Sequence, residues 1–338
     1  LHKAIRRQRQ MCIRDSNITN AQNPFYGQYH TPHETVPFDR IETEHYEPAI
    51  LEGIKLQNAE IEAIIQNPEK ADFTNTIEAF EESGKLLDKV VAVFGNMLSA
   101  ETNDDLQELA QKIMPLLSEH SNNITLNKKL FARVKEVYNQ KETLQLTQEQ
   151  KQLLENAYNS FIRHGANLEG EAREEYRRLT TELSKLTLTF SENNLKETNA
   201  YQMLLTKKES LAGLPEIIIE AAAETAKNEE KEGWAFTLHA PSYIPFMTYS
   251  DNRDLRQKLY MAYNTKCTHD NEFNNIDIVK KIANTRMKIA QLLGYKDYAE
   301  YTLKKRMAEN SQSVYKLLNQ LLEAYTPTCL LYTSDAAD

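Results

Sequence analysis

The chain has 338 residues, of which 41% are hydrophobic and 26% charged, and its mean hydropathy is −0.62. This is the composition of a globular protein with about two domains or one large one, and no stretch approaches the ~18 apolar residues of a transmembrane helix, which excludes a membrane-spanning protein. Only 9 Gly and 10 Pro occur, which disfavours glycine-rich phosphate loops and turn-dense β-sandwiches and favours a mostly helical protein.

The two ends of the chain are related through DNA. A back-translation of residues 6–16, reverse-complemented and read in a shifted frame, gives residues 329–338. The shared element resembles a transposase-type sequencing adapter, so we interpret residues 1–16 and 329–338 as translated adapter DNA and leave them out of the fold reasoning. This interpretation predicts that the natural protein extends beyond residues 17–328 on both sides.

Leaving out the ends alters the charge and the cysteine count. Five basic and three acidic side chains are removed, so the formal net charge changes from −9 to −11. An acidic balance argues against a nucleic-acid partner. Of the three cysteines only Cys267 remains, so we expect neither a disulfide framework nor a cysteine-based zinc site.

The first half of the chain predicts an extended start followed by helices. Residues 23–40 contain three prolines and several aromatic side chains, which indicates an extended segment lying over a surface. Helices are expected to begin at four capping residues, with a capping box in the last case: Thr43, Asn75, Asn103 and Thr147. Gly84 lies on the apolar stripe of residues 77–98, where it would let a neighbouring helix approach closely.

A long helix is predicted over residues 169–198, with four apolar residues on its inner face: Leu179, Leu183, Leu186 and Phe190. Short strands are then expected at residues 201–205 and 234–238, and a rigid loop at Pro241 and Pro245. Further helices are predicted at residues 216–230, 252–266, 276–293, 295–303 and 311–325. The predicted fold class is therefore all-α, mainly helical, with one small β element near residues 201–238.

Motif searches find no complete active site. The chain contains no HExxH, G-x-S-x-G, GxxxxGK[ST] or GxGxxG pattern. His30 and His33 form the single close histidine pair, but Pro32 between them favours a surface loop over a metal site. The other histidines outside the adapter-like ends are isolated, which favours packed or exposed side chains over metal ligands: His45, His120, His164, His239 and His269.

Two further patterns leave alternatives open. The acid-dense stretches at residues 171–175 and 229–232 favour solvated helix faces with ion pairs one turn apart. Residues 240–246, with two prolines around Tyr243, could line a peptide groove or form a structural corner, and the corner is favoured. Arg253 and Arg256 are expected to be paired within the fold.

An ordered series of short motifs carries a resemblance to a known family. The motifs are PFDRI at 37–41, HYEPA at 45–49, AEI at 59–61, AI at 63–64, FTNTI at 73–77, ESGKLL at 82–87, LFARV at 130–134, FSEN at 190–193, LAGLP at 211–215, APSY at 240–243 and NRDLR at 252–256. Together they resemble the M3 family of zinc metallopeptidases, and within it the bacterial peptidyl-dipeptidases, over residues 23–327.

The resemblance implies a two-lobed, clam-like helical peptidase with a deep channel that admits short peptides. It implies a zinc held by an HExxH motif and a distant Glu, with the motif's Glu as general base. These residues lie downstream of the part of the family that this chain matches, so no catalytic, cofactor-binding or metal-binding residue is assigned here.

The resemblance also implies a domain division and a function. Residues 17–200 would form an N-terminal helical lobe, and residues 201–328 would begin the peptidase domain, ending before the zinc site. The chain would then be an N-terminal fragment of a zinc peptidyl-dipeptidase or oligopeptidase, inactive alone, with short peptides and the missing catalytic half as partners and no nucleic acid or membrane. A cytoplasmic location is expected, with a periplasmic one left open. The alternative is a metal-free helical module that binds peptides or proteins without catalysis.

Overall fold

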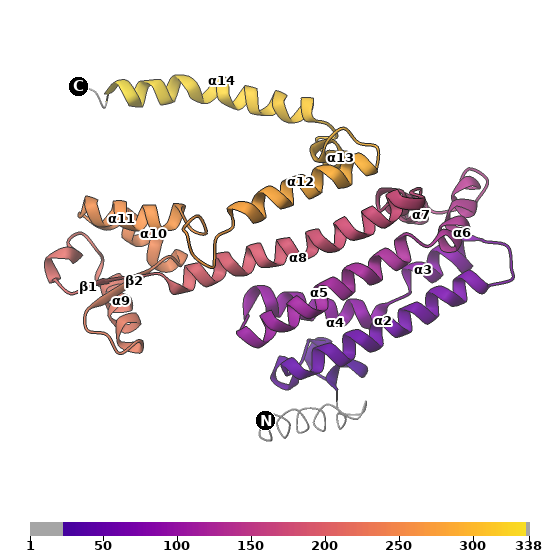
Figure 1. Ribbon diagram of the computed structural model, residues 1–338, viewed down its shortest axis with the longest axis horizontal. Helices are drawn as coiled ribbons and strands as arrows, with labels where there is room; N and C mark the ends of the chain where they lie inside the picture. Colours follow the sequence, from indigo (N-terminus) through magenta and orange to yellow (C-terminus); the bar gives the residue numbers. More distant parts are fainter. Residues whose placement is uncertain (1–22, 336–338) are drawn as a thin grey trace. The chain divides into compact units, whose positions relative to one another are not determined.

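The computed structural model describes residues 23–335, with side chains described to residue 330, and shows the expected mainly helical fold with one two-stranded sheet (Figure 1). The adapter interpretation of residues 1–16 lies outside the described residues. The chain divides into two compact units: one reaches Glu182 and resumes at Met287, and the other is Leu183–Arg286. In the described part, no helix is both long and apolar enough to cross a bilayer.

The first unit is built from helices. Its elements are η1 (Pro24–Tyr26), η2 (Pro32–Glu34), η3 (Phe38–Arg40), α2 (Thr43–Gln66), η4 (Phe73–Glu78), α3 (Ala79–Glu81), α4 (Lys85–Ala100), α5 (Asp104–Thr125), α6 (Lys128–Asn139), α7 (Gln148–Arg163), the first part of α8 (Gly170–Ala200), the end of α12 (Ile276–Leu292), α13 (Tyr298–Leu303) and α14 (Ser311–Asp335).

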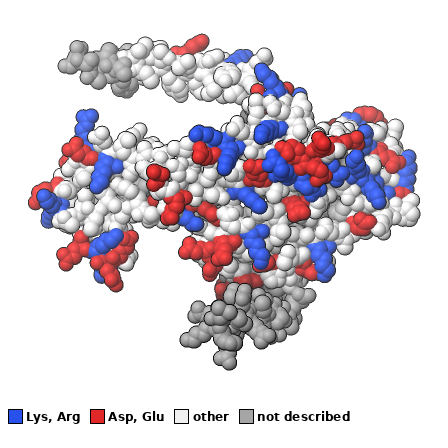
Figure 2. Space-filling view, viewed as in Figure 1, with Lys and Arg blue, Asp and Glu red and all other residues white. Residues whose placement is uncertain are grey.

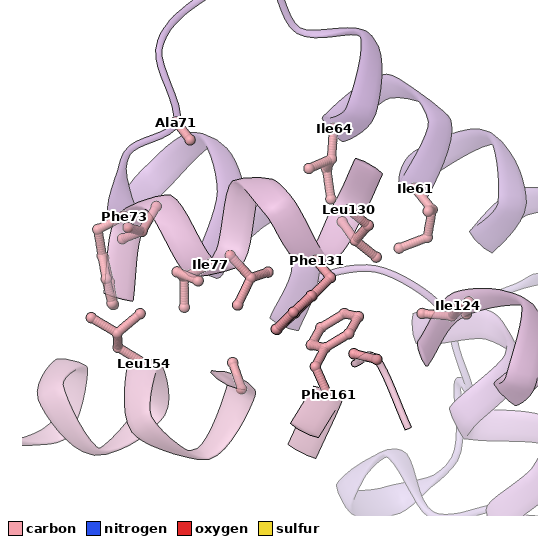
Figure 3. Close-up of a cluster of buried hydrophobic side chains, with 14 residues drawn as sticks. Ile61, Ile64, Ala71, Phe73, Ile77, Ile124, Leu130, Phe131, Leu154 and Phe161 are labelled. Carbon is pink, nitrogen blue, oxygen red and sulfur yellow. The ribbon is translucent and has the colours of Figure 1, made fainter. Parts of the chain in front are cut away.

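The apolar stripes of α2, η4, α6 and α7 meet in one core (Figure 3). Phe161 of α7 is buried in this core, with its ring centroid 5.4 Å from that of Phe80 and 5.7 Å from that of Phe131. Each fully buried side chain of this size stabilises the fold by roughly 1.5–3 kcal/mol. Leu154 of α7 and Ile77 of η4 are buried in the same core.

Local capping signals set several of the helix starts. Asn103 accepts a hydrogen bond from the backbone N–H of Leu106 at 2.8 Å, and Thr147 and Gln150 form the expected reciprocal capping box. The prediction that Asn75 caps a helix is wrong. Asp72 is the N-cap of the π-helical segment η4, and Asn75 is its reciprocal partner three residues later.

The N-terminal segment is extended as predicted, with short 3₁₀ turns, and it is fastened to α4. The Lys89 ammonium donates to the backbone carbonyls of Phe25 (3.1 Å) and Gly27 (2.8 Å) and lies 3.9 Å from the centroid of the Tyr29 ring. The Phe25 side chain is fully buried. One cation therefore satisfies two carbonyls that the extended backbone leaves without helical partners.

The second unit contains the end of α8, β1 (Gln202–Leu205), η5 (Lys208–Leu211), α9 (Glu216–Asn228), β2 (Trp234–Thr237), α10 (Ala240–Tyr249), α11 (Arg253–Asn264) and the start of α12. The two predicted strands pair antiparallel, with Gln202 opposite Thr237. Met203, Leu205 and Phe236 of the sheet pack with Phe246 and Leu259 in a separate core.

Two expectations for this unit are wrong. Residues 240–249 form helix α10 where a rigid loop was predicted, because Pro241 lies in the first turn, where no N–H is needed, and Phe246 is anchored against Phe236 at 4.6 Å. Phe190 of α8, expected to face inward, is 38% exposed.

Candidate functional site

The predicted candidates are not brought together into a ligand set. His30 and His33 are both exposed, as the surface-loop interpretation expected, and His33 lies within η2. In the part of the chain that the structure describes, no group of three His, Cys, Asp or Glu side chains could hold a metal ion.

Three other histidines serve local structure. His45 Nδ1 accepts from the backbone N–H of Glu42 at 2.9 Å and completes the capping of α2. His120 is buried, with Nε2 2.7 Å from Gln57 Oε1, and burial lowers its pKa. His239 is exposed and contacts Thr237 and Asn199.

The acid-dense stretches are solvated, as predicted. Glu175 pairs with Arg178 at 2.7 Å on α8, and Glu229 pairs with Lys231 at 2.6 Å after α9. Figure 2 shows acidic and basic side chains interspersed on the visible face. Exposed pairs of this kind contribute little to stability or to binding.

Residues 240–246 include both buried and exposed side chains. Phe246 is fully buried, whereas Ile244 is 58% exposed. The Tyr243 ring stacks on Tyr263 of α11 with centroids 4.1 Å apart. Beyond this segment, the Arg256 guanidinium donates to the backbone carbonyl of Ser250, so this arginine is paired within the fold as expected.

A polar cluster in the second unit carries no local signal in the sequence. Glu197, near the end of α8, is 9% exposed and accepts hydrogen bonds from the backbone N–H of Cys267 and from His269 Nδ1 at 2.7 Å. Asn271 Nδ2 lies 3.4 Å from the same carboxylate. Cys267 adopts a left-handed backbone conformation (φ 58°) that non-glycine residues rarely take, so the carboxylate holds a strained turn in place.

The electrostatics of this cluster indicate a structural role. We call Glu197, with its hydrogen-bond partners Cys267, His269 and Asn271, the clamp. Burial alone would raise the pKa of Glu197, but hydrogen bonds from His269, Cys267 and Asn271 outweigh it and lower the pKa. Burial and the neighbouring carboxylate raise the pKa of the Cys267 thiol to about 11. A thiol in this environment stays protonated and is a poor nucleophile.

The clamp borders a mostly apolar pocket of about 440 Å³, with Glu197, Tyr201 and His269 among its lining residues. The Tyr201 hydroxyl is buried without a hydrogen-bond partner. Glu197 and His269 are 72 residues apart in sequence, so no local spacing could have paired them. The arrangement fixes the 265–275 loop on α8, and it offers neither an activated nucleophile nor a metal-ligand set.

Comparison with known proteins tests the resemblance. Residues 246–338 match the model of peptidase family M3. The resemblance to peptidase family M3 is confirmed. The match runs to residue 338, so it includes residues 329–338, for which an adapter origin stays a prediction.

Individual curated relatives match along nearly the whole chain. Oligopeptidase A of Salmonella typhimurium is 30% identical over 309 residues, which cover 90% of this chain and 45% of that protein. Dipeptidyl carboxypeptidase of Escherichia coli is 33% identical over 303 residues, 89% of this chain and 44% of that protein. A "Probable cytosolic oligopeptidase A" of Arabidopsis thaliana is 28% identical over 303 residues, 87% of this chain and 42% of that protein.

The chain therefore spans less than half the length of the curated relatives that it matches. The identities to oligopeptidase A and to dipeptidyl carboxypeptidase are similar, so they do not distinguish the two kinds of relative.

Proposed function

We propose that this chain is the N-terminal part of a zinc-dependent oligopeptidase or peptidyl-dipeptidase that hydrolyses short peptides and releases C-terminal dipeptides. The observation that carries the proposal is continuous similarity of about 30% over some 90% of the chain to relatives named oligopeptidase A and dipeptidyl carboxypeptidase. Motifs spread from residue 37 to residue 256 agree with a continuous relationship.

The segment's role in this proposal is structural. Residues 17–200 form the N-terminal helical lobe and residues 201–328 begin the peptidase domain. The chain contains no HExxH, and its described residues do not fit a zinc site. The catalytic residues and the zinc therefore belong to the part of the protein outside this chain, and the chain alone binds no zinc and is inactive.

The partners follow from the same proposal. They are short peptides as substrates and the missing catalytic half, with no nucleic acid and no membrane. The acidic net charge of −9 supports the absence of a nucleic-acid partner. A cytoplasmic location is supported by the name of the Arabidopsis relative, and the periplasm stays open.

The alternative is a metal-free helical module that binds peptides or proteins without catalysis. It is favoured by the presence of a separate apolar core in each of the two units.

One experiment separates the two proposals. The source gene is read across the codons for residues 16–17 and 328–329. The peptidase proposal expects the frame to continue after Thr328 into an HExxH motif and a downstream Glu. The protein encoded by that frame should bind one zinc and release dipeptides from peptide C-termini, measured by mass spectrometry. A stop codon directly after Thr328 would contradict this proposal and support the binding module.

A further inference from the structure

We propose that the start of α6 and the first two turns of α8 form a binding site for a phosphate group, supplied as free phosphate or as a phosphate ester. The site lies within the first unit and is independent of the peptidase proposal. It is a pocket of about 380 Å³ whose lining includes four cationic side chains, Lys128, Lys129, Arg173 and Arg177, against one carboxylate, Glu62.

The local charge is opposite to that of the whole chain. The pocket lining carries a formal excess of positive charge in a protein whose net charge is −9. The single acidic side chain in the lining, Glu62, accepts a hydrogen bond from Gln66 Nε2 at 2.6 Å. An anion entering this pocket would therefore meet mainly attractive charges.

Most of the positive charge is not neutralised by ion pairs. Among the described residues, Lys129, Arg173 and Arg177 take part in none of the ion pairs that the structure forms. Lys128 pairs with Glu169 at 2.8 Å, but the carboxylate is 77% exposed, and such a pair is easily exchanged for another anion.

The guanidinium groups of Arg173 and Arg177 have N–H donors that can bind a further acceptor. Arg177 Nη1 donates to a neutral partner, the amide oxygen of Asn123, at 2.5 Å. Arg173 Nε is buried and has no hydrogen-bond partner. A buried N–H without a partner is costly, and an oxyanion in the pocket could accept from it.

The geometry of the two helices suits a multivalent oxyanion. Arg173 and Arg177 are four residues apart on α8, so their side chains project from the same face one turn apart. Lys128 and Lys129 are the first residues of the 12-residue helix α6, whose N-terminus favours negative charge. Asn127 already accepts from the N–H groups of Lys129 and Leu130, so the helix contributes its dipole while the side chains supply the donors.

These features favour phosphate over a carboxylate. A phosphate dianion has three or more acceptor oxygens and can bind two guanidinium groups at once, whereas a carboxylate has two oxygens and one charge. The pocket is larger than a single phosphate, so a small ester group also fits.

The test is isothermal titration of the chain with inorganic phosphate and, separately, with glycerol 2-phosphate, at constant ionic strength set with chloride. We expect saturable binding of at least one of them, weakened at least about tenfold in an Arg173→Gln/Arg177→Gln variant. Binding of both indicates a site for the phosphate group itself, and binding of the ester alone indicates contacts to its organic part.

Arg178→Gln is the matched control, because Arg178 is the next residue on α8 but pairs with Glu175 and Glu182 and does not line the pocket. It should bind as tightly as the unmodified chain. Lys129→Gln, at an exposed position, provides a second variant should the double substitution unfold α8, and it should bind more weakly. The proposal is overturned if neither phosphate compound shows saturable binding. It is also overturned if Lys129→Gln and the Arg173→Gln/Arg177→Gln variant both bind as tightly as the unmodified chain.

Discussion

Glu197 is the residue on which the 265–275 loop depends. Its buried carboxylate accepts hydrogen bonds from Cys267 and His269, and the lowered pKa means that the folded chain favours the charged form. We expect Glu197→Gln to lower the free energy of unfolding by about 1–3 kcal/mol at pH 7. Urea unfolding followed by circular dichroism would measure this change.

The pH dependence of this effect has a definite sign. The folded pKa of Glu197 lies below the ordinary value of 4.5, so the unfolded chain binds the proton more tightly. The stabilisation by the Glu197 carboxylate is complete at pH values above the ordinary pKa of 4.5, and it is lost as the pH falls through the lowered pKa of the folded chain. The loss of unfolding free energy in Glu197→Gln should therefore become smaller in acid. Glu220→Gln, an exposed acid of the same unit, is the control. An equal cost for both variants would show that Glu197 is not a clamp.

His120 makes a second prediction at this scale. Burial lowers its pKa below the ordinary 6.5, so between these values the unfolded chain binds a proton that the folded chain does not. Stability should therefore decline as the pH falls below about 6.5. In His120→Gln the thermal midpoint should vary less between pH 7 and pH 5. The exposed His164→Gln should leave that variation unchanged, and a similar flattening in both variants would refute the assignment to His120.

At the scale of elements, Gly84 joins two helices. It is the N-cap of α4 with φ 79°, its N–H donates to Glu60 Oε2 at 2.8 Å, and a Cβ there would lie 2.3 Å from the Gln57 side chain of α2. The atoms that this Cβ would meet are the flexible end of the Gln57 side chain, so the close approach of a neighbouring helix expected at Gly84 stays a prediction, and the left-handed backbone is what favours glycine here. Gly84→Ala should destabilise the chain by about 1–3 kcal/mol, because the left-handed backbone is strained by any Cβ.

Gly95 provides the internal control for this prediction. It lies within the same helix α4, and a Cβ there would meet nothing within 4 Å. Gly95→Ala should stabilise the chain by up to about 1 kcal/mol through helix propensity. Both midpoints of denaturant unfolding can be measured under the same conditions. If the two substitutions changed stability in the same direction, the left-handed backbone at Gly84 would not be the cause.

Elements fixed by local chemistry could be predicted, and those decided by distant contacts could not. Asn103, the Thr147 capping box and the two short strands were read correctly because their signals lie within a few residues. The prediction of a loop at residues 240–249 was wrong because Pro241 is compatible with the first turn of a helix and Phe246 is buried in the core despite Pro245. Helix α6 was not predicted from the sequence as a separate helix.

The candidate site shows the same limit. The sequence predicted each histidine separately as a packed or exposed side chain and not as a metal ligand. For His30 and His33, the predicted surface loop agrees with their exposure. The cluster of Glu197, Cys267 and His269 depends on contacts across about 70 residues, for which a single sequence carries no spacing signal. Family motifs predicted the resemblance to peptidase family M3 because they occur in order between residues 37 and 256.

At the scale of the whole molecule, the exposed apolar side chains of α14 predict that the chain self-associates. They are Tyr315, Leu317, Leu318, Leu321, Leu322 and Tyr325. Several large apolar side chains exposed on one helix favour association with another surface. Both the peptidase proposal and the adapter interpretation expect the isolated chain to expose such a surface, so its self-association is the property to measure.

We expect the purified chain to self-associate, with a sedimentation coefficient that rises with concentration. Leu318→Lys/Leu322→Lys should lower this association, because two charges on adjacent turns would have to be desolvated in any contact. Asn319→Lys/Gln320→Lys adds the same charge to the same helix at polar positions and should leave association nearly unchanged. If the unmodified chain sedimented as a monomer at every concentration, or if both variants dissociated equally, the α14 side chains would not be the associating surface. Reduced association in the leucine variant alone would identify α14 as the surface that a partner must cover.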